Sequence, residues 1–158
     1  MPTTRIEPAQ RADAPRLTHI AMAAKRHWGY SDELMRMWSA DLTVTAETID
    51  KFAVYVARRD GVAAGFYALS QEGAEIELEH MWVAPEAMGA GIGALLFTHA
   101  LAASRALGGS RLLIASDPHA EGFYLRMGAQ RVGEVASTPA GRSLPLLRVA
   151  LTGHVADE

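Results

Sequence analysis

The sequence contains no cysteine, so disulfides, thiolate catalysis and cysteine metal sites are excluded. No apolar run approaches the roughly 20 residues of a membrane-spanning helix, and the first residues lack the pattern of a secretory signal peptide. Charge of one sign is not in excess, because the net charge is only −3, and nucleic acid is not expected as a partner. The histidines lack metal-ligand spacing, so no catalytic metal is expected. These absences predict a soluble, cytoplasmic protein, and its 158 residues suit a single domain over 1–158.

A glycine-rich stretch between a strand and a helix is the feature around which the chain is organised. Residues 75–83 alternate and then become apolar, as in a strand, and residues 94–107 are rich in strong helix formers. Three glycines, Gly89, Gly91 and Gly93, lie between them. At such a helix start, free backbone N–H groups and the helix dipole attract an anion, and glycine allows close approach. The stretch therefore predicts a phosphate-binding loop.

Two widespread phosphate-binding motifs do not fit this loop. No lysine or hydroxyl follows Gly93, so the motif for a triphosphate with magnesium is missing. The dinucleotide motif would need a third glycine at Leu96, which disfavours a dinucleotide-dependent reductase. Taken alone, the motif leaves a turn without any ligand as an equal alternative.

The rest of the chain alternates between short strands and helices. The pattern predicts strands at 3–7, 53–57, 62–69, 111–115, 131–135 and 144–151, and helices at 13–26, 31–38 and around 120–127. Residues 111–115 are continuously apolar, as expected of a buried parallel strand. The order β-α-α-β-β-β-α-β-α-β-β predicts an α/β protein with a mixed sheet and one parallel central pair.

The glycine loop and its flanks resemble the coenzyme A pyrophosphate loop of the GNAT superfamily of N-acyltransferases. The residues on the family pattern are Val83, Pro85, Gly89, Gly91, Ile92 and Gly93, whereas Met88 stands where the family usually has arginine or glutamine. Residues 117–129 resemble the second motif of the family, with His119 in place of the asparagine that is usual in one small bacterial branch. The tetrapeptide 27–30 and residues 141–145 also resemble that branch, so the likeness covers nearly the whole chain.

This resemblance implies the GNAT acyl-CoA N-acyltransferase fold, in which the central strands splay and the acyl-pantetheine lies in the gap. It implies an N-acetyltransferase that uses acetyl-CoA and acetylates a primary amine of a small molecule or peptide by direct attack, and it leaves a homodimer open. The residues that it assigns to the coenzyme are Met81, Trp82, Val83, Met88, Gly89, Ala90, Gly91, Ile92, Gly93, Asp117, His119, Phe123 and Tyr124. Those assigned to the acceptor are His27, Trp28, Tyr30 and His80, although a packed hydrophobic hinge is an equal alternative for residues 27–30.

Amide formation needs a neutral amine, donors for the developing oxyanion and a proton for the leaving thiolate. The resemblance places the Tyr124 hydroxyl near the thioester sulfur, although core packing is an alternative role for this ring. Strand alternation predicts Glu75, Glu77 and Glu79 on one face, with Met81 and Val83 continuing it and His80 on the other face.

Glu79 lies nearest the strand end and matches the position that often carries the base in the family, so it is the predicted base. His80 and a water chain stay open as alternatives. A catalytically lapsed acyl-CoA sensor or structural protein is the alternative function, because Met88 and His119 depart from the family pattern.

Overall fold

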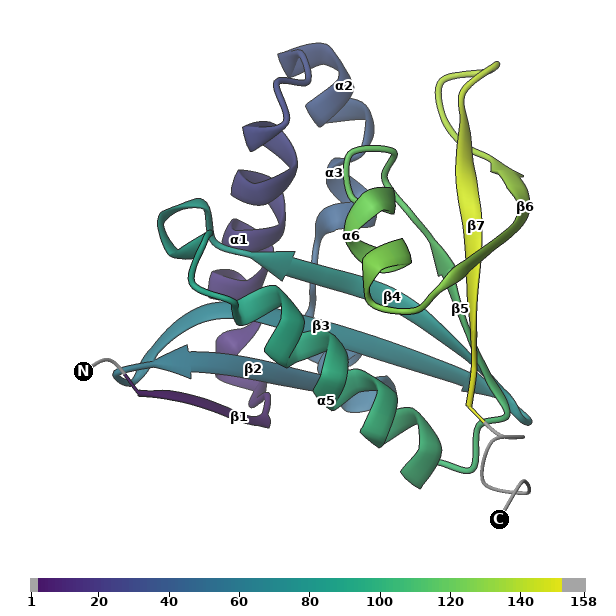
Figure 1. The fold of residues 1–158 in the computed structure, drawn as a ribbon. Coiled ribbons are helices and arrows are strands. Elements are labelled where there is room, and N and C mark those ends of the chain that lie inside the picture. The colour runs from purple at the N-terminus through teal and green to yellow at the C-terminus, as the bar shows by residue number, and fades with distance from the viewer. Residues whose placement is uncertain (1–2, 152–158) are drawn as a thin grey trace.

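A seven-stranded mixed sheet forms the centre of the computed structural model, which describes residues 3–151 (Figure 1). Its strands lie in the order β1-β2-β3-β4-β5-β7-β6, and all neighbours are antiparallel except the parallel pair β4 and β5. Their bounds are β1 (Thr4–Pro8), β2 (Ala53–Arg59), β3 (Val62–Glu72), β4 (Glu75–Val83), β5 (Arg111–Ala115), β6 (Gln130–Ala136) and β7 (Ser143–Ala150). The predicted mixed sheet with one parallel central pair is confirmed.

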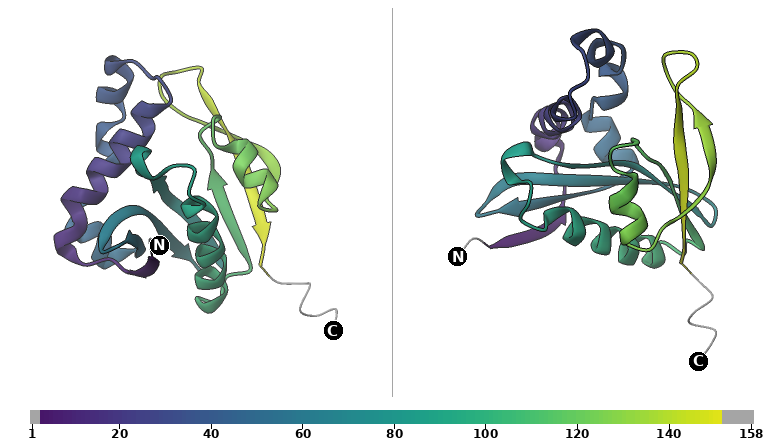
Figure 2. Two further views of the ribbon diagram at one scale, coloured as in Figure 1. Left: turned by 60° about the vertical axis from the view of Figure 1, so that its left-hand side comes forward. Right: turned by 45° about the horizontal axis from the view of Figure 1, so that its top comes forward.

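Helices cover both faces of this sheet. Two views show α1 (Ala14–His27) and α2 (Asp32–Met37) on one face, with α5 (Ile92–Ala106) and α6 (Glu121–Arg126) on the other (Figure 2). The apolar stripe of α1 that the sequence predicts is buried, from Leu17 to Ala24. None of the helices within residues 3–151 has the length and apolar character needed to cross a membrane.

The segment between α2 and β2 received no element from the sequence pattern but is helical. It forms α3 (Ser39–Leu42) and α4 (Ala46–Lys51), and two short 3-10 turns, η1 (Arg11–Asp13) and η2 (Pro85–Ala87), precede α1 and α5. The side chain of Thr45 caps α4 by accepting the backbone N–H of Thr48. Helices this short give too few turns for a periodic pattern to be read.

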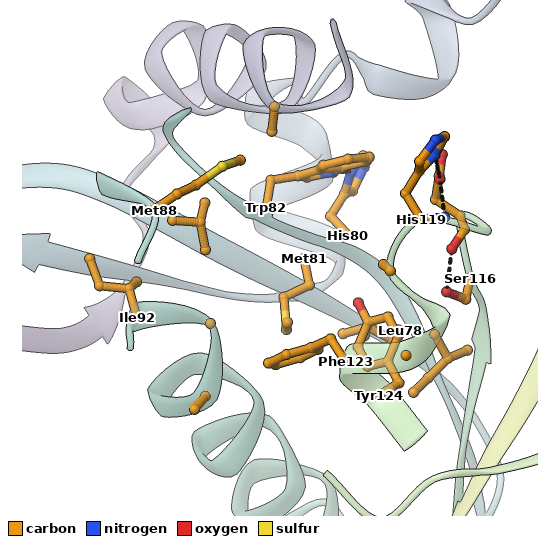
Figure 3. Close-up of a pocket in the computed structure, with 18 of the residues that line it drawn as sticks. Leu78, His80, Met81, Trp82, Met88, Ile92, Ser116, His119, Phe123 and Tyr124 are labelled. Carbon is orange, nitrogen blue, oxygen red and sulfur yellow. Dashed lines mark hydrogen bonds and ion pairs between the residues drawn. The ribbon is translucent and has the colours of Figure 1, made fainter. Parts of the chain in front are cut away.

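A β-bulge in β4 overturns the predicted alternation of its side chains. Ala68 of β3 pairs with His80 and Leu69 pairs with Leu78, so Glu79 is an extra residue in β4. Beyond the bulge, Met81 points toward α6, while His80 and Trp82 point toward α1 (Figure 3). The prediction that Met81 and Val83 continue the glutamate face and that His80 turns away from it is therefore wrong. A one-residue insertion exchanges the faces of all residues that follow.

The two central parallel strands pair over only a short length. β4 and β5 are in register at Glu75↔Arg111, Ile76↔Leu112 and Glu77↔Leu113, and β4 then continues to Val83 without a partner on that side. β5 instead pairs with β7 as far as Ala115. On its other side β4 stays close to β3, because a Cβ at Gly65 would lie 2.8 Å from the backbone oxygen of Trp82. The predicted gap thus opens between β4 and β5, at the bulge.

Candidate active site

The loop before α5 presents backbone N–H groups rather than side chains. Gly89 and Gly91 have φ angles of 85° and 80°, and Gly91 is the N-cap residue of α5. A Cβ at either position would meet nothing within 4 Å, so glycine serves the left-handed backbone there and not packing. The first-turn N–H groups of α5 have no acceptor within the helix, and the helix dipole adds positive potential at this end. This geometry suits an anion.

A cavity of about 620 Å³ runs from this loop into the gap between β4 and β5 (Figure 3). Its walls are residues 78–83 of β4, the loop and first turn of α5, residues 114–117 at the end of β5 and just after it, His119 and Ala120, α6, and Ala24 and Trp28 at the end of α1. All predicted coenzyme residues line it except Ala90, as do the predicted acceptor residues Trp28 and His80. His27 and Tyr30, the other two, do not line it.

Tyr124 lies deep in this cavity, on α6. Its ring packs edge-on against Phe97 and Phe123, with centroids 5.3 Å away in both cases. Burial raises the pKa of Tyr124 above its ordinary value, and the nearby charge of Asp117 adds to the effect. Its hydroxyl makes no hydrogen bond to another part of residues 3–151. The structure therefore provides a protonated hydroxyl on the cavity wall that is free to donate.

Two neighbouring side chains of β4, Trp82 and His80, form a fixed pair on the α1 face. The indole Nε1–H of Trp82 donates to Nδ1 of His80 at 3.1 Å. Because Nδ1 accepts, the neutral ring carries its proton on Nε2 and has no free lone pair. Burial lowers the pKa of His80, which keeps the ring neutral. As arranged, His80 can donate to a ligand but cannot take a proton from it.

The predicted base, Glu79, is an exposed residue of the same cavity lining. The hydroxyl of Ser70 donates to its carboxylate at 2.6 Å. The neighbouring Glu77 has a raised pKa because of burial and the charges of Glu79, Glu75 and Glu72. These carboxylates give the rim of β4 a negative character, and the role of Glu79 as base stays a prediction.

Six side chains from four segments meet beside the cavity, and we refer to them as the Lys25–Asp117 cluster: Lys25, Tyr30, Trp38, Asp117, His119 and Arg142. The ammonium group of Lys25 and the carboxylate of Asp117 form an ion pair in which the side chains are 10% and 7% exposed. The Tyr30 hydroxyl donates to Asp117 at 3.0 Å. The backbone N–H and the Nδ1 atom of His119 both lie 2.9 Å from Asp117 Oδ1.

Arg142 and Trp38 connect this cluster to the loop between β6 and β7. The guanidinium of Arg142 donates to the Tyr30 hydroxyl at 3.2 Å and lies 4.6 Å from the Trp38 ring centroid. Nε1 of Trp38 donates to the backbone oxygen of Thr138 at 3.0 Å. The cluster therefore joins α1, the segment from Tyr30 through α2 to Trp38, the segment after β5 and the β6–β7 loop around one carboxylate.

The ionisation of the cluster follows from burial and pairing. Burial lowers the pKa of Lys25, against the hydrogen bond and charge of Asp117. Burial would raise the pKa of Asp117, but the hydrogen bonds from Lys25 and His119 and the charge of Lys25 hold it below its usual range. Asp117 is thus a carboxylate at neutral pH.

Sequence reasoning missed Lys25, Arg142 and Arg126 as residues of this region. The sequence did contain one signal for Lys25. It follows Ala21 and Ala24 on the buried stripe of α1, and a buried charge needs a partner of opposite charge. Arg126 of α6 is the one arginine or lysine in the cavity lining within residues 3–151. No group of three histidine, aspartate or glutamate side chains in this range could hold a metal ion.

Comparisons with known proteins agree with this geometry. Residues 28–138 match a family model described as an acetyltransferase (GNAT) domain. PaiA N-acetyltransferase from Thermoplasma acidophilum, solved in complex with coenzyme A, is 18% identical, with a TM-score of 0.75 and coverage of 94% of this chain and 99% of the other.

Two further solved structures have the same fold. For a GCN5-related N-acetyltransferase from Rhodopseudomonas palustris the identity is 20%, the TM-score 0.78 and the coverage 94% and 96%. The structure of yncA, described as a putative acetyltransferase from Salmonella typhimurium, was solved with acetyl-CoA. Its identity to this chain is 20%, the TM-score is 0.69, and the coverage is 96% of each chain. No curated protein matches the chain.

Replacing Lys25 by methionine should destabilise the fold strongly, because it leaves the buried carboxylate of Asp117 without its cation. Such losses are typically about 3 kcal/mol or more of the free energy of unfolding. Arg26→Met is the matched control, since Arg26 pairs with Asp32 at the surface and should cost less than about 1 kcal/mol. Urea denaturation measures the free energy of unfolding of both variants.

The difference between wild type and Lys25→Met should shrink in acid. The stability that Asp117 supplies is present above the ordinary pKa of aspartate and is lost as the pH falls through its lower folded value. Equal losses in the two variants at neutral pH would contradict the buried pair.

Proposed function

The chain belongs to the GNAT acetyltransferase family, and we propose that it transfers the acetyl group of acetyl-CoA to a primary amine of a small molecule or peptide by direct attack. The observation that carries the proposal is one cavity that extends from the N-terminus of α5 to the hydroxyl of Tyr124, a largely buried residue. Acetyl-CoA has phosphates at one end and a thioester at the other, linked by an extended arm with two amides. The cavity offers complementary groups in the same order.

The loop residues fit the phosphate end of the coenzyme. N–H groups of residues 89–94 would hold the pyrophosphate, and the guanidinium of Arg126 supplies a cation that the loop itself lacks at Met88. The edge of β4 that faces the gap has no strand partner beyond Glu77, so its backbone groups can pair with the amides of the arm. Two structural neighbours were solved with coenzyme A or acetyl-CoA, which supports acetyl-CoA as the ligand.

Three groups of the chain would serve the chemistry. Backbone N–H groups of β4 between Met81 and Val83 that face the gap would stabilise the negative charge on the carbonyl oxygen. Tyr124 would give its proton to the departing sulfur, so that coenzyme A leaves as a free thiol. A proton acceptor on the cavity wall must first make the amine neutral. Glu79, the residue indicated by the sequence, is one candidate for that step, and His80 is not.

Turnover separates this function from the alternative of a lapsed acyl-CoA sensor. Wild-type protein mixed with acetyl-CoA and a panel of amines, including amino acids, polyamines, aryl amines and peptides, should release free thiol with at least one acceptor. Mass spectrometry of that acceptor should show one added acetyl group. Tight acetyl-CoA binding without thiol release from any amine would favour the sensor.

Gly91→Glu should weaken acetyl-CoA binding by at least about tenfold, or about 1.4 kcal/mol. The variant places a carboxylate and a strained left-handed residue where the phosphates would bind. Gly61→Glu is the matched control, because Gly61 has nearly the same φ angle, 84°, in the β2–β3 turn and does not line the cavity. Calorimetry measures both affinities, and equal affinities would show that the loop does not hold the coenzyme.

Tyr124→Phe should lower kcat by about 100-fold, the usual scale for a positioned proton donor, and leave stability nearly unchanged. The ring and its packing stay, and the hydroxyl has no partner to lose among the described residues. Tyr55→Phe is the control, because it removes a tyrosine hydroxyl from a residue that does not line the cavity. Its kcat should stay at the wild-type value. Unchanged kcat in Tyr124→Phe at saturating substrate would leave Tyr124 as a packing residue.

A further inference from the structure

His119 is held in one orientation at the wall of the cavity by contacts on two sides. Its ring stacks on Trp28 at 5.0 Å with an interplanar angle of 9°, and Nδ1 lies 2.9 Å from Asp117 Oδ1. Asp117 is 7% exposed, whereas the His119 side chain is 43% exposed. One edge of the ring therefore faces a buried carboxylate, while the half-exposed side chain belongs to the cavity lining.

The position of the proton on this ring follows from its neighbours. A carboxylate can only accept, so a deprotonated Nδ1 would place two lone pairs against each other at 2.9 Å. Nδ1 of the neutral ring must therefore carry the proton and donate it to Asp117. The Tyr30 hydroxyl, 3.2 Å from Nδ1, donates to Asp117 instead and accepts from Arg142. Nε2 of His119 makes no hydrogen bond to residues 3–151, so its lone pair is free with respect to this part of the chain.

His119 and His80 consequently have opposite tautomers on opposite walls of the same cavity. Nδ1 of His80 accepts from Trp82, so its Nε2 is a donor, whereas Nε2 of His119 is an acceptor. A carboxylate that holds the far nitrogen of an imidazole is the arrangement that orients histidine bases in other enzymes. Glu79, in contrast, is exposed and already accepts the Ser70 hydroxyl.

The groups that face His119 keep this arrangement at neutral pH. Asp117 on its own segment stays ionised through Lys25 of α1, and Tyr30 keeps its proton because burial and the charge of Asp117 raise its pKa. Arg142 of the β6–β7 loop lies 3.8 Å from Asp117. From the end of α1, Trp28 covers the ring, and His27 contacts Trp28 on its edge.

We propose that His119, oriented by Asp117, is the base that takes the proton from the acceptor amine; this inference rests on the proposed function. The N–H bond of the ammonium breaks, the Nε2–H bond forms, and the electron pair stays on the amine nitrogen, which attacks the thioester. The nitrogen loses a second proton as the amide forms, and one proton reaches the sulfur through Tyr124. His119 passes its own proton to solvent from its exposed edge, so each turnover releases one proton.

His119→Asn tests the base, because asparagine keeps hydrogen-bonding capacity and cannot carry a proton. At neutral pH kcat/KM for the amine should fall by about 100-fold with the KM for acetyl-CoA unchanged. In the wild type we expect kcat/KM to rise with pH on the acid side of its profile. In the variant this rise, the acid limb, should move up to the pKa of the free ammonium, and kcat/KM should partly recover at high pH. His19→Asn, the same change on the exposed face of α1 and away from the cavity, should behave as wild type. Glu79→Gln should keep the wild-type limb.

A readout that needs no turnover separates this inference from the proposed function. Nitrogen-15 NMR of the imidazoles, assigned with the two asparagine variants, should show His119 protonated at Nδ1. Protonation at Nε2 would overturn the base assignment even if amines are acetylated. The base assignment would also be overturned if His119→Asn kept the wild-type acid limb, or if a raised KM for acetyl-CoA were the only effect of that variant. Loss of the acid limb in Glu79→Gln but not in His119→Asn would overturn it as well.

Discussion

The short parallel pairing between β4 and β5 is the constraint on which the rest of the structure depends. The strands share three register positions, after which the bulge at Glu79 and the pairing of β5 with β7 separate them. A half-buried strand edge with unpaired backbone groups is costly unless something occupies it. In this chain the edge of β4 lies in a cavity that starts at the N-terminus of α5. An extended ligand with amides and phosphates would therefore satisfy the backbone groups of the strand edge and those of the helix terminus.

A second constraint fixes the opposite wall. The Lys25–Asp117 cluster collects segments that are far apart in the sequence around a single buried carboxylate. A buried ion pair adds little net stability compared with an apolar contact, but it fixes geometry, because each donor must find its acceptor. Its consequence for the site is the fixed plane of His119 against Trp28. His119 is thereby held in one orientation on that wall.

Much of the fold and the loop before α5 could be predicted from the sequence, because both depend on patterns among residues that are close together in the chain. Strand and helix periods predicted the strands and the longer helices in order, though not α3 and α4, and glycine spacing predicted the loop before α5. The bulge could not be predicted, because it depends on how β4 aligns with Ala68 and Leu69 of β3. Lys25 and Asp117 are 92 positions apart, and only the packing of α1 on the sheet brings them together. The faces of β4 and the proton acceptors were therefore the least predictable part of the site.

A crystal structure of the protein with coenzyme A bound would show whether the gap between β4 and β5 is the coenzyme site. We expect the pyrophosphate on the backbone N–H groups of residues 89–94, the pantetheine arm along the open edge of β4, and the sulfur within hydrogen-bonding reach of the Tyr124 hydroxyl. Coenzyme bound outside the gap, or inside it with its sulfur far from Tyr124, would overturn the proposed site.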